Sequence, residues 1–371
     1  MQNSSFEDQP KDLFSPSTPP PLPSPFNKEN QTENWQGVQT FTFSGSTSEY
    51  FGIWIVNILL TIITIGFYSP WAKVRRLRYF YGCTQFINRR FDFTGIPSRI
   101  LIGRLIAFGI YFTIAILSEY SVTIAIFGFL FIYLAAPWLV CATLRFRGRN
   151  SKFGNSRFYF SGTNKQAYIE FLKGVALVIC TFGLAFPVLV WLYKRYFFDH
   201  LYVGQLKFKM NADWPIYVGA MYVPLLACIC LFSLLIFGAF IFGGVISAIG
   251  VEGMIFIGFT VYFLCIAFIW PWMSARLFIA TWNNTSLSES QFKTNSNEYY
   301  YAWIVMSNWI VKILTLGLMT PWAAIRLYKY QAESISLELN NDPNTMINRL
   351  QNNPIGIGEE IADVFDFDIS L

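Results

Sequence analysis

The chain has 371 residues, of which 54% are hydrophobic, 19% aromatic and 13% charged. A soluble domain of this size carries about 25% charged residues, so the composition excludes an ordinary soluble protein and is typical of a polytopic membrane protein. The net charge is +5, but the basic residues lie beside apolar runs. This placement argues against nucleic-acid binding and favours membrane orientation and contact with anionic lipid.

The first 36 residues are polar and rich in proline and serine, and they include the run from Pro19 to Pro25. Such a composition cannot bury a core, so residues 1–36 are predicted to form a disordered tail. No basic-then-apolar signal sequence opens the chain, and we expect the first apolar run to direct membrane insertion. Residues 340–371 are rich in acidic side chains and are predicted to form an acidic carboxy-terminal tail.

Seven apolar runs lie between the two tails, in a membrane domain predicted to cover residues 37–339. Each run is close to the roughly 20 residues that a helix needs to cross the hydrocarbon core. The runs cover about 51–69, 100–117, 121–140, 171–192, 216–244, 251–272 and 300–320.

Two pairs of runs are separated by a few residues, and these pairs are predicted to form transmembrane helical hairpins at 100–140 and 216–272. Their turns carry Glu119 and Glu252, whereas the chain outside both hairpins is rich in Lys and Arg. By the positive-inside rule, the basic ends are cytoplasmic and the acidic turns face outward.

The other three runs share the pattern Thr-x-Gly-x-x-x-Pro, which begins at Thr64, Thr181 and Thr315. Each occurrence ends an apolar run and lies between short stretches of alternating polarity, which are typical of strands. Glycine loosens a helix and proline suits the first turn of the next one, so each pattern predicts a break. The predicted structural breaks are Gly66, Pro70, Gly183, Pro187, Gly317 and Pro321. The three repeated units cover about 41–95, 158–209 and 292–339.

The fold expected from these elements is an α-helical polytopic membrane protein. It contains two transmembrane helical hairpins, three repeated units of apolar helix, Gly/Pro break and basic helix, and short strands on the cytoplasmic side. The run at 171–192 has basic residues at both ends, which favours broken or re-entrant helices in the repeated units. The four other runs would then cross the membrane, with both termini inside. The alternative is seven plain spans with an external amino terminus.

A more specific signal lies in the stretch Tyr68-Ser69-Pro70-Trp71-Ala72-Lys73-Val74-Arg75, which is accompanied by Phe91-Asp92-Phe93-Thr94-Gly95 and the acidic ending Glu359 to Phe365. These residues resemble the bacterial YjgN family, and the resemblance covers roughly residues 37–371. It implies a multi-pass inner-membrane protein of a Gram-negative bacterium. The family is a domain of unknown function, so the resemblance implies no chemistry or substrate.

The sequence offers no constellation typical of a catalytic, cofactor or metal site. His200 is the single histidine, the six cysteines are scattered, and the motifs of nucleophilic serines and phosphate-binding loops are absent. We therefore expect a protein that is not an enzyme, with no catalytic residues, no cofactor and no metal. Its expected contacts are membrane lipids rather than nucleic acid, and its protein partners are left open.

Polar side chains inside the apolar runs are better candidates for function, because burying them in lipid is costly without a partner or a cavity. Those that could line a polar pathway between the repeats are Asn57, Thr61, Thr64, Asn308 and Lys312. Hydrogen bonding between helices is the structural alternative. Interrupted apolar helices favour transport of a small solute, ion or lipid. A non-transporting membrane scaffold or regulator, which binds cytoplasmic partners through its tails, is the second hypothesis.

Overall fold

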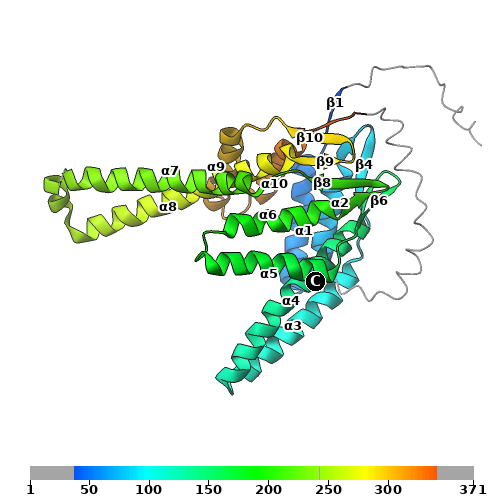
Figure 1. Cartoon of the computed structure of the whole chain (residues 1–371), viewed down its shortest axis with the longest axis horizontal. Coiled ribbons are helices and arrows are strands. Elements are labelled where there is room, and N and C mark those ends of the chain that lie inside the picture. Colours follow the sequence, from blue (N-terminus) through cyan, green and yellow to red (C-terminus); the bar gives the residue numbers. More distant parts are fainter. Residues whose placement is uncertain (1–36, 242, 341–371) are drawn as a thin grey trace, which may run out of the picture. The chain divides into compact units, whose positions relative to one another are not determined.

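Helices and short strands alternate along the chain in the computed structural model, which describes residues 37–241 and 243–340 (Figure 1). The predicted tails, residues 1–36 and those from 341 onward, lie outside the described residues. The helices are α1 (Thr47–Ile63), α2 (Ser69–Gly82), α3 (Pro97–Ser118), α4 (Val122–Asn150), α5 (Asn164–Cys180), α6 (Phe186–Asp199), α7 (Trp214–Ile241), α8 (Gly243–Asn283), α9 (Glu298–Leu314) and α10 (Thr320–Glu333). The strands are β1 (Val38–Thr40), β2 (Thr42–Phe43), β3 (Thr84–Phe86), β4 (Arg89–Phe93), β5 (Ser151–Phe153), β6 (Ser156–Phe160), β7 (Leu201–Val203), β8 (Leu206–Met210), β9 (Thr285–Leu287), β10 (Ser290–Thr294) and β11 (Ile335–Glu338).

The strands form one antiparallel sheet whose order is β1-β11-β10-β9-β8-β7-β6-β5-β4-β3-β2. Its two edge strands, β1 and β2, follow each other in the chain and are separated by Phe41 alone. In β1, Gln39 pairs with Leu337 of β11, and in β2, Phe43 pairs with Thr84 of β3. The sheet therefore closes almost completely into a barrel, and the first and last strands of the described chain make the closure.

The barrel is built from a regular module, in which an incoming helix leads into a two-stranded hairpin and an outgoing helix leaves it. Four hairpins have the same plan, a strand of three residues, a turn of two and a strand of five; they are β3–β4, β5–β6, β7–β8 and β9–β10. The fifth hairpin is split between the chain ends, because β11 supplies one strand and β1 with β2 the other. The helices also form a closed ring, because α10, the last described helix, packs against α1, the first.

A buried proline marks the same position in every incoming helix. Pro70 lies fourteen residues before Thr84, the first residue of β3. The same spacing relates Pro137 to Ser151, Pro187 to Leu201, Pro271 to Thr285, and Pro321 to Ile335. In α2, α6 and α10 the proline lies in the first turn, where a helix has an N–H without a partner and the missing donor of proline costs nothing. In α4 and α8 it lies inside a longer helix.

Aromatic side chains fill the barrel. The second strand of each hairpin contributes one phenylalanine at the same position, and together these residues form a phenylalanine belt of Phe41, Phe91, Phe158, Phe208 and Phe292. Successive rings lie 6.2, 6.3, 6.4 and 5.9 Å apart between centroids, which is the range for aromatic contact. The first strands add a buried layer of Phe86, Phe153, Val203, Leu287 and Leu337. The barrel is therefore packed with side chains, as small barrels are, and is not an open pore.

The Phe-x-Gly ends of three strands have a packing cause. The ring of Phe160 lies over Gly162, and a Cβ added at that glycine would lie 2.5 Å from the ring. Phe43 with Gly45, and Phe93 with Gly95, repeat this arrangement. Where the aromatic residue is replaced by Met210 or Thr294, the glycine is replaced as well, by Ala212 and Ser296. Glycine is therefore required at these positions because the aromatic ring leaves no room for a Cβ.

The predicted fold class, an α-helical polytopic membrane protein with minor strands, is wrong. The strands form an eleven-stranded, nearly closed sheet, and the helices are not a simple transmembrane bundle. Among the described residues, three helical segments are long and apolar enough to cross a membrane: Pro97–Ser118, Val122–Asn150 and Trp214–Leu234. The short strands themselves were predicted, but their assembly into one sheet depends on pairings such as β1 with β11, which join distant parts of the chain and leave no local sequence pattern.

Candidate functional site

A cavity of about 610 Å³ lies where the incoming helices meet the barrel. All five incoming helices line it, with Tyr81 from α2, Arg147 from α4, Lys194 from α6, Trp282 from α8 and Tyr328 from α10. Strand residues complete the wall, and Phe41, Phe91 and Phe158 of the phenylalanine belt also border it. Because every module contributes to it, we call it the central cavity.

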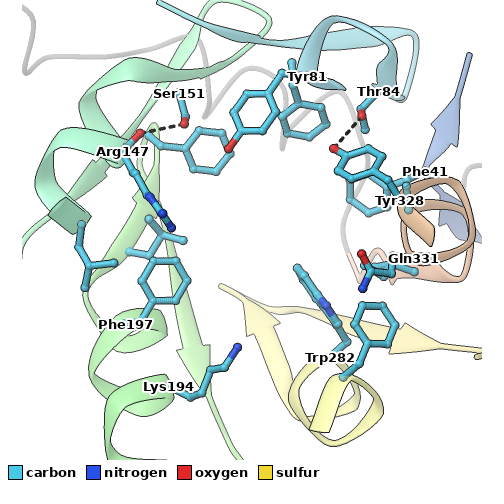
Figure 2. Close-up of a pocket in the computed structure, with 18 of the residues that line it drawn as sticks. Phe41, Tyr81, Thr84, Arg147, Ser151, Lys194, Phe197, Trp282, Tyr328 and Gln331 are labelled. Atoms are coloured by element: carbon cyan, nitrogen blue, oxygen red, sulfur yellow. Dashed lines mark hydrogen bonds between the residues drawn. The ribbon is translucent and has the colours of Figure 1, made fainter. Parts of the chain in front are cut away.

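One wall of the central cavity carries neutral polar groups. The Thr84 hydroxyl donates to the Phe80 carbonyl at 2.7 Å, so its oxygen accepts from the Tyr328 hydroxyl, 3.0 Å away (Figure 2). Burial raises the pKa of Tyr328, which keeps the hydroxyl protonated as a donor. Gln331, on the same helix as Tyr328, donates to the Tyr301 hydroxyl at 2.6 Å. These contacts fix α10 against β3 and α9.

The facing wall is basic. Figure 2 shows Arg147 and Lys194 on the α4 and α6 side of the central cavity, with their charged ends extending toward its interior. Burial lowers the pKa of Lys194 from 10.5, and no carboxylate opposes that effect. Among the described residues that line the central cavity there is no Asp or Glu. The cavity is therefore aromatic, positively charged and able to donate hydrogen bonds.

The three Thr-x-Gly turns join α1 to α2, α5 to α6 and α9 to α10. Each turn has two successive residues with positive φ, such as Phe182 at 51° and Gly183 at 92°. The Thr181 hydroxyl donates to the Leu177 carbonyl at 2.7 Å and accepts from the Ala185 N–H at 2.9 Å. The Gly183 N–H donates to the Val178 carbonyl at 2.7 Å. The turn thus satisfies much of its backbone without water.

These turns also expose their most apolar side chain. Ile65, Phe182 and Leu316 occupy the middle position of the pattern and are 89%, 98% and 95% exposed. An isoleucine with positive φ is strained, because its Cβ is branched. The backbone holds a strained conformation that points an apolar side chain away from the protein in all three turns. We refer to these turns as the apolar tips.

Comparison with known proteins bears on this architecture. The family model described as "Bacterial protein of unknown function (DUF898)" matches residues 38–364. The chain belongs to this family. "Inner membrane protein YjgN" of Salmonella typhimurium is 24% identical over 88% of this chain and 96% of its own length. The YjgN protein of Escherichia coli K12 is 31% identical over 34% of this chain and 32% of its own length. No solved structure matches the chain.

The resemblance to the YjgN family is confirmed, and this DUF898 chain is a membrane protein whose named relatives are inner-membrane proteins. The Tyr-Ser-Pro-Trp stretch that carried the resemblance lies at the start of α2, directly after an apolar tip. Its Pro70 is the first of the five equivalent prolines.

The polar-pathway residues lie away from the central cavity, since none of the five lines it. Asn57 and Asn308 are buried in α1 and α9, the first helices of two short hairpins. The Asn308 amide donates to the Ala323 carbonyl at 3.0 Å, and its oxygen lies 3.4 Å from the Arg326 guanidinium. Glycine replaces asparagine in the middle repeat, where a Cβ on Gly174 would lie 2.3 Å from Leu189. A polar pathway at these residues stays a prediction.

The remaining candidates complete the short hairpins. Thr61 donates to the Asn57 carbonyl at 2.6 Å, and Thr64 donates to the Leu60 carbonyl at 2.7 Å as part of its tip. Lys312 lies in the last turn of α9, and its carbonyl accepts from the Gly317 N–H. The predicted break residues lie in the three tips and at the starts of the helices that follow: Gly66, Pro70, Gly183, Pro187, Gly317 and Pro321.

Replacing Asn308 by alanine is expected to lower the free energy of unfolding by about 1–3 kcal/mol, because a buried hydrogen-bonding side chain is lost. Asn57→Ala is the matched comparison and is expected to cost less, since the Asn57 Oδ1 atom is buried without a hydrogen-bond partner in the described structure. Thermal unfolding of both variants in lipid nanodiscs measures the difference. Equal losses would contradict the role assigned to the Asn308 contacts.

Sequence reasoning missed Arg147 and Lys194, which were assigned to membrane orientation with the other basic residues. Lys194 lies seven residues after Pro187, and Arg147 lies ten after Pro137. Other cavity residues share these offsets, including Tyr328 at seven and Gln331 at ten after Pro321. Aligning the five prolines would have placed these residues on one helix face, because offsets of seven and ten are one turn apart.

Proposed function

We propose that this chain is a multi-pass inner-membrane protein that transports a small solute or lipid through the central cavity. The observation that carries the proposal is the position of that cavity, which is lined by all five incoming helices and bordered by the phenylalanine belt. Its volume lies within the roughly 300–1,000 Å³ of small-molecule sites. The belt would then act as the barrier on the barrel side. A transport role is preferred to an enzymatic one, because the described lining includes no nucleophile–base pair.

The proposed topology follows from the hairpins. Every helical hairpin begins and ends at the barrel, so all strand-bearing segments lie on one side of the membrane, and their many basic residues make that side cytoplasmic. The long hairpins α3–α4 and α7–α8 would cross the bilayer. Helix α5 has 17 residues, about 26 Å, and is short of the roughly 30 Å core. The short hairpins would re-enter on the cytoplasmic side.

The apolar tips support the re-entrant arrangement. Backbone groups in hydrocarbon must find partners within the protein, and the tips provide such partners through Thr181, Gly183 and their equivalents. A turn in water would not need an apolar side chain that is 98% exposed, as Phe182 is. The scaffold hypothesis depends on the two tails, and no observation on the described residues favours it.

Cysteine accessibility tests transport without knowledge of the substrate. A single cysteine replaces Ser151, which lines the central cavity, in a variant lacking the six native cysteines. A transporter opens its site to each side in turn, so a membrane-impermeant maleimide is expected to label Ser151→Cys in both right-side-out and inside-out vesicles. Glu119→Cys, in the α3–α4 turn, is expected to react in right-side-out vesicles alone. Lys207→Cys, on the outside of β8, is expected to react in inside-out vesicles alone.

Two results would contradict the proposal. Labelling of Ser151→Cys from one side alone would describe a cavity that opens to that side only, and labelling of Glu119→Cys from the cytoplasmic side would reverse the topology. A matched pair of bulky variants adds a control. Ala332→Trp fills the central cavity and should suppress the labelling, whereas Ile126→Trp, at an exposed position of α4, should not.

A further inference from the structure

The basic wall of the central cavity has no counter-charge among its described lining residues. Arg147 and Lys194 come from the neighbouring modules of α4 and α6 and extend into the same space (Figure 2). The other titratable lining residues are three tyrosines, Tyr81, Tyr193 and Tyr328. Helix α8 contributes Phe278 and Trp282, and α5 and α7 contribute no lining residue. The site therefore presents two basic groups, Arg147 and Lys194, and no acidic one among its described lining residues.

Further positive charge lies behind Arg147. Burial lowers the pKa of Lys73 of α2, and the positive charges of Arg147, Arg104 and Arg76 lower it further. Arg104 itself donates to the Ser69 hydroxyl at 2.5 Å. Cations that are partly withdrawn from water are costly unless an anion compensates them. This part of the structure is thus suited to a bound anion.

The rest of the central cavity is apolar. Trp282, Phe278 and Phe197 lie around it, and three rings of the phenylalanine belt border it. An inorganic anion would leave this surface without a partner, while a neutral apolar molecule would leave Arg147 and Lys194 unpaired. The Thr84–Tyr328 pair, on the facing wall, adds polar oxygen near the barrel.

We propose that the central cavity binds an amphipathic anion, with its carboxylate or phosphate group at Arg147 and Lys194 and its apolar body along Trp282, Phe278 and Phe197. A guanidinium binds either oxyanion through paired hydrogen bonds, and the ammonium adds a point charge. The assignment deepens the proposed function and rests on it in one respect, since the bound anion would be the transported solute.

The test uses the full chain in phosphatidylcholine nanodiscs, which lack net charge, and dansylaminoundecanoate as the fluorescent probe. Dodecanoate and dodecyl phosphate are expected to displace the probe, and their relative strengths identify the preferred head group. Dodecanol and inorganic phosphate are expected to compete at least tenfold more weakly. Arg147→Gln and Lys194→Gln should each weaken probe binding about tenfold or more, because each removes a charged hydrogen bond. Lys207→Gln, on the outer face of β8, should leave it unchanged.

Proton release from Lys194 provides a second readout. Its lowered pKa means that the ammonium loses its charge below pH 10.5, so probe affinity is expected to fall as pH rises through that lowered value. Lys194→Arg keeps its charge and should bind the probe without this alkaline loss. If a glutamine variant does not fold, the conservative variants Lys194→Arg and Arg147→Lys replace it in the probe-binding measurement.

The assignment is overturned if dodecanol competes as well as dodecanoate, or if both glutamine variants bind the probe normally. Probe binding together with one-sided labelling of Ser151→Cys would retain the anion site and end the transport proposal. Two-sided labelling of Ser151→Cys without probe binding would retain the transport proposal and end the anion-site assignment.

Discussion

Phe208→Ala is expected to lower the free energy of unfolding by about 3–5 kcal/mol, the usual loss for truncating a buried phenylalanine. Phe208 is 7% exposed and lies between Phe158 and Phe292 in the belt, with ring centroids 6.4 and 5.9 Å away. It also contacts Phe198 of α6, at 6.4 Å. The truncation removes contacts to two neighbouring hairpins and to a helix. Because the barrel is nearly closed, these elements have little freedom to move into the cavity that the ring leaves.

Thermal unfolding in nanodiscs, followed by tryptophan fluorescence, measures this effect. Lys207→Ala and Lys209→Ala are matched controls, because both residues lie on the same strand and are exposed. Surface changes of this kind alter stability by about 0.5 kcal/mol or less. A Phe208→Ala variant as stable as these controls would mean that the belt does not hold the modules together.

Phe182→Asp is expected to lower stability in the membrane by about 2.5–3.5 kcal/mol, the cost assigned to a charged residue at the centre of an inserted helix. Phe182 is the exposed side chain of the α5–α6 apolar tip. If this tip lies in hydrocarbon, an aspartate there loses its hydration, whereas Phe182→Leu keeps the apolar contact and should have little effect. The unfolding temperature in nanodiscs reports the difference.

Tyr120→Asp is the comparison for the Phe182 variant. Tyr120 is 81% exposed at the outer turn between α3 and α4, next to Glu119, where the proposed topology places water. Its replacement is expected to be neutral. Equal effects of the two aspartates would contradict the re-entrant position of the short hairpins.

The sequence predicts single elements of this fold better than their assembly. The Thr-x-Gly pattern, the prolines and the alternating strands were visible, because each is a local signal with a local cause. Three repeats were predicted where the structure has five modules. In two modules, Pro137 and Pro271 lie inside longer helices, without the glycine turn that marks the others. Because these longer apolar runs lack the glycine turn, the two modules were not recognised as further copies of the repeat.

The candidate site also depends on assembly, which the sequence does not predict well. Asn57 and Asn308 were selected because a polar group in an apolar helix is unusual; the structure buries both and pairs Asn308 with the neighbouring helix α10. Arg147 and Lys194 were assigned to orientation, because a basic residue near a helix end needs no further explanation. Their convergence depends on the ring of helices, which is set by strand pairing between segments far apart in the chain.

The split hairpin has a consequence for synthesis in the cell. The strand that closes the sheet, β11, ends at Glu338, and its partner β1 begins at Val38. A ribosome therefore completes almost the whole membrane domain before the last strand exists. Until then, one edge of the growing sheet has open hydrogen-bonding groups, and a chain that stops early keeps that edge. Ring closure therefore requires translation as far as Glu338, and a chain that stops before β11 is marked by its unpaired sheet edge.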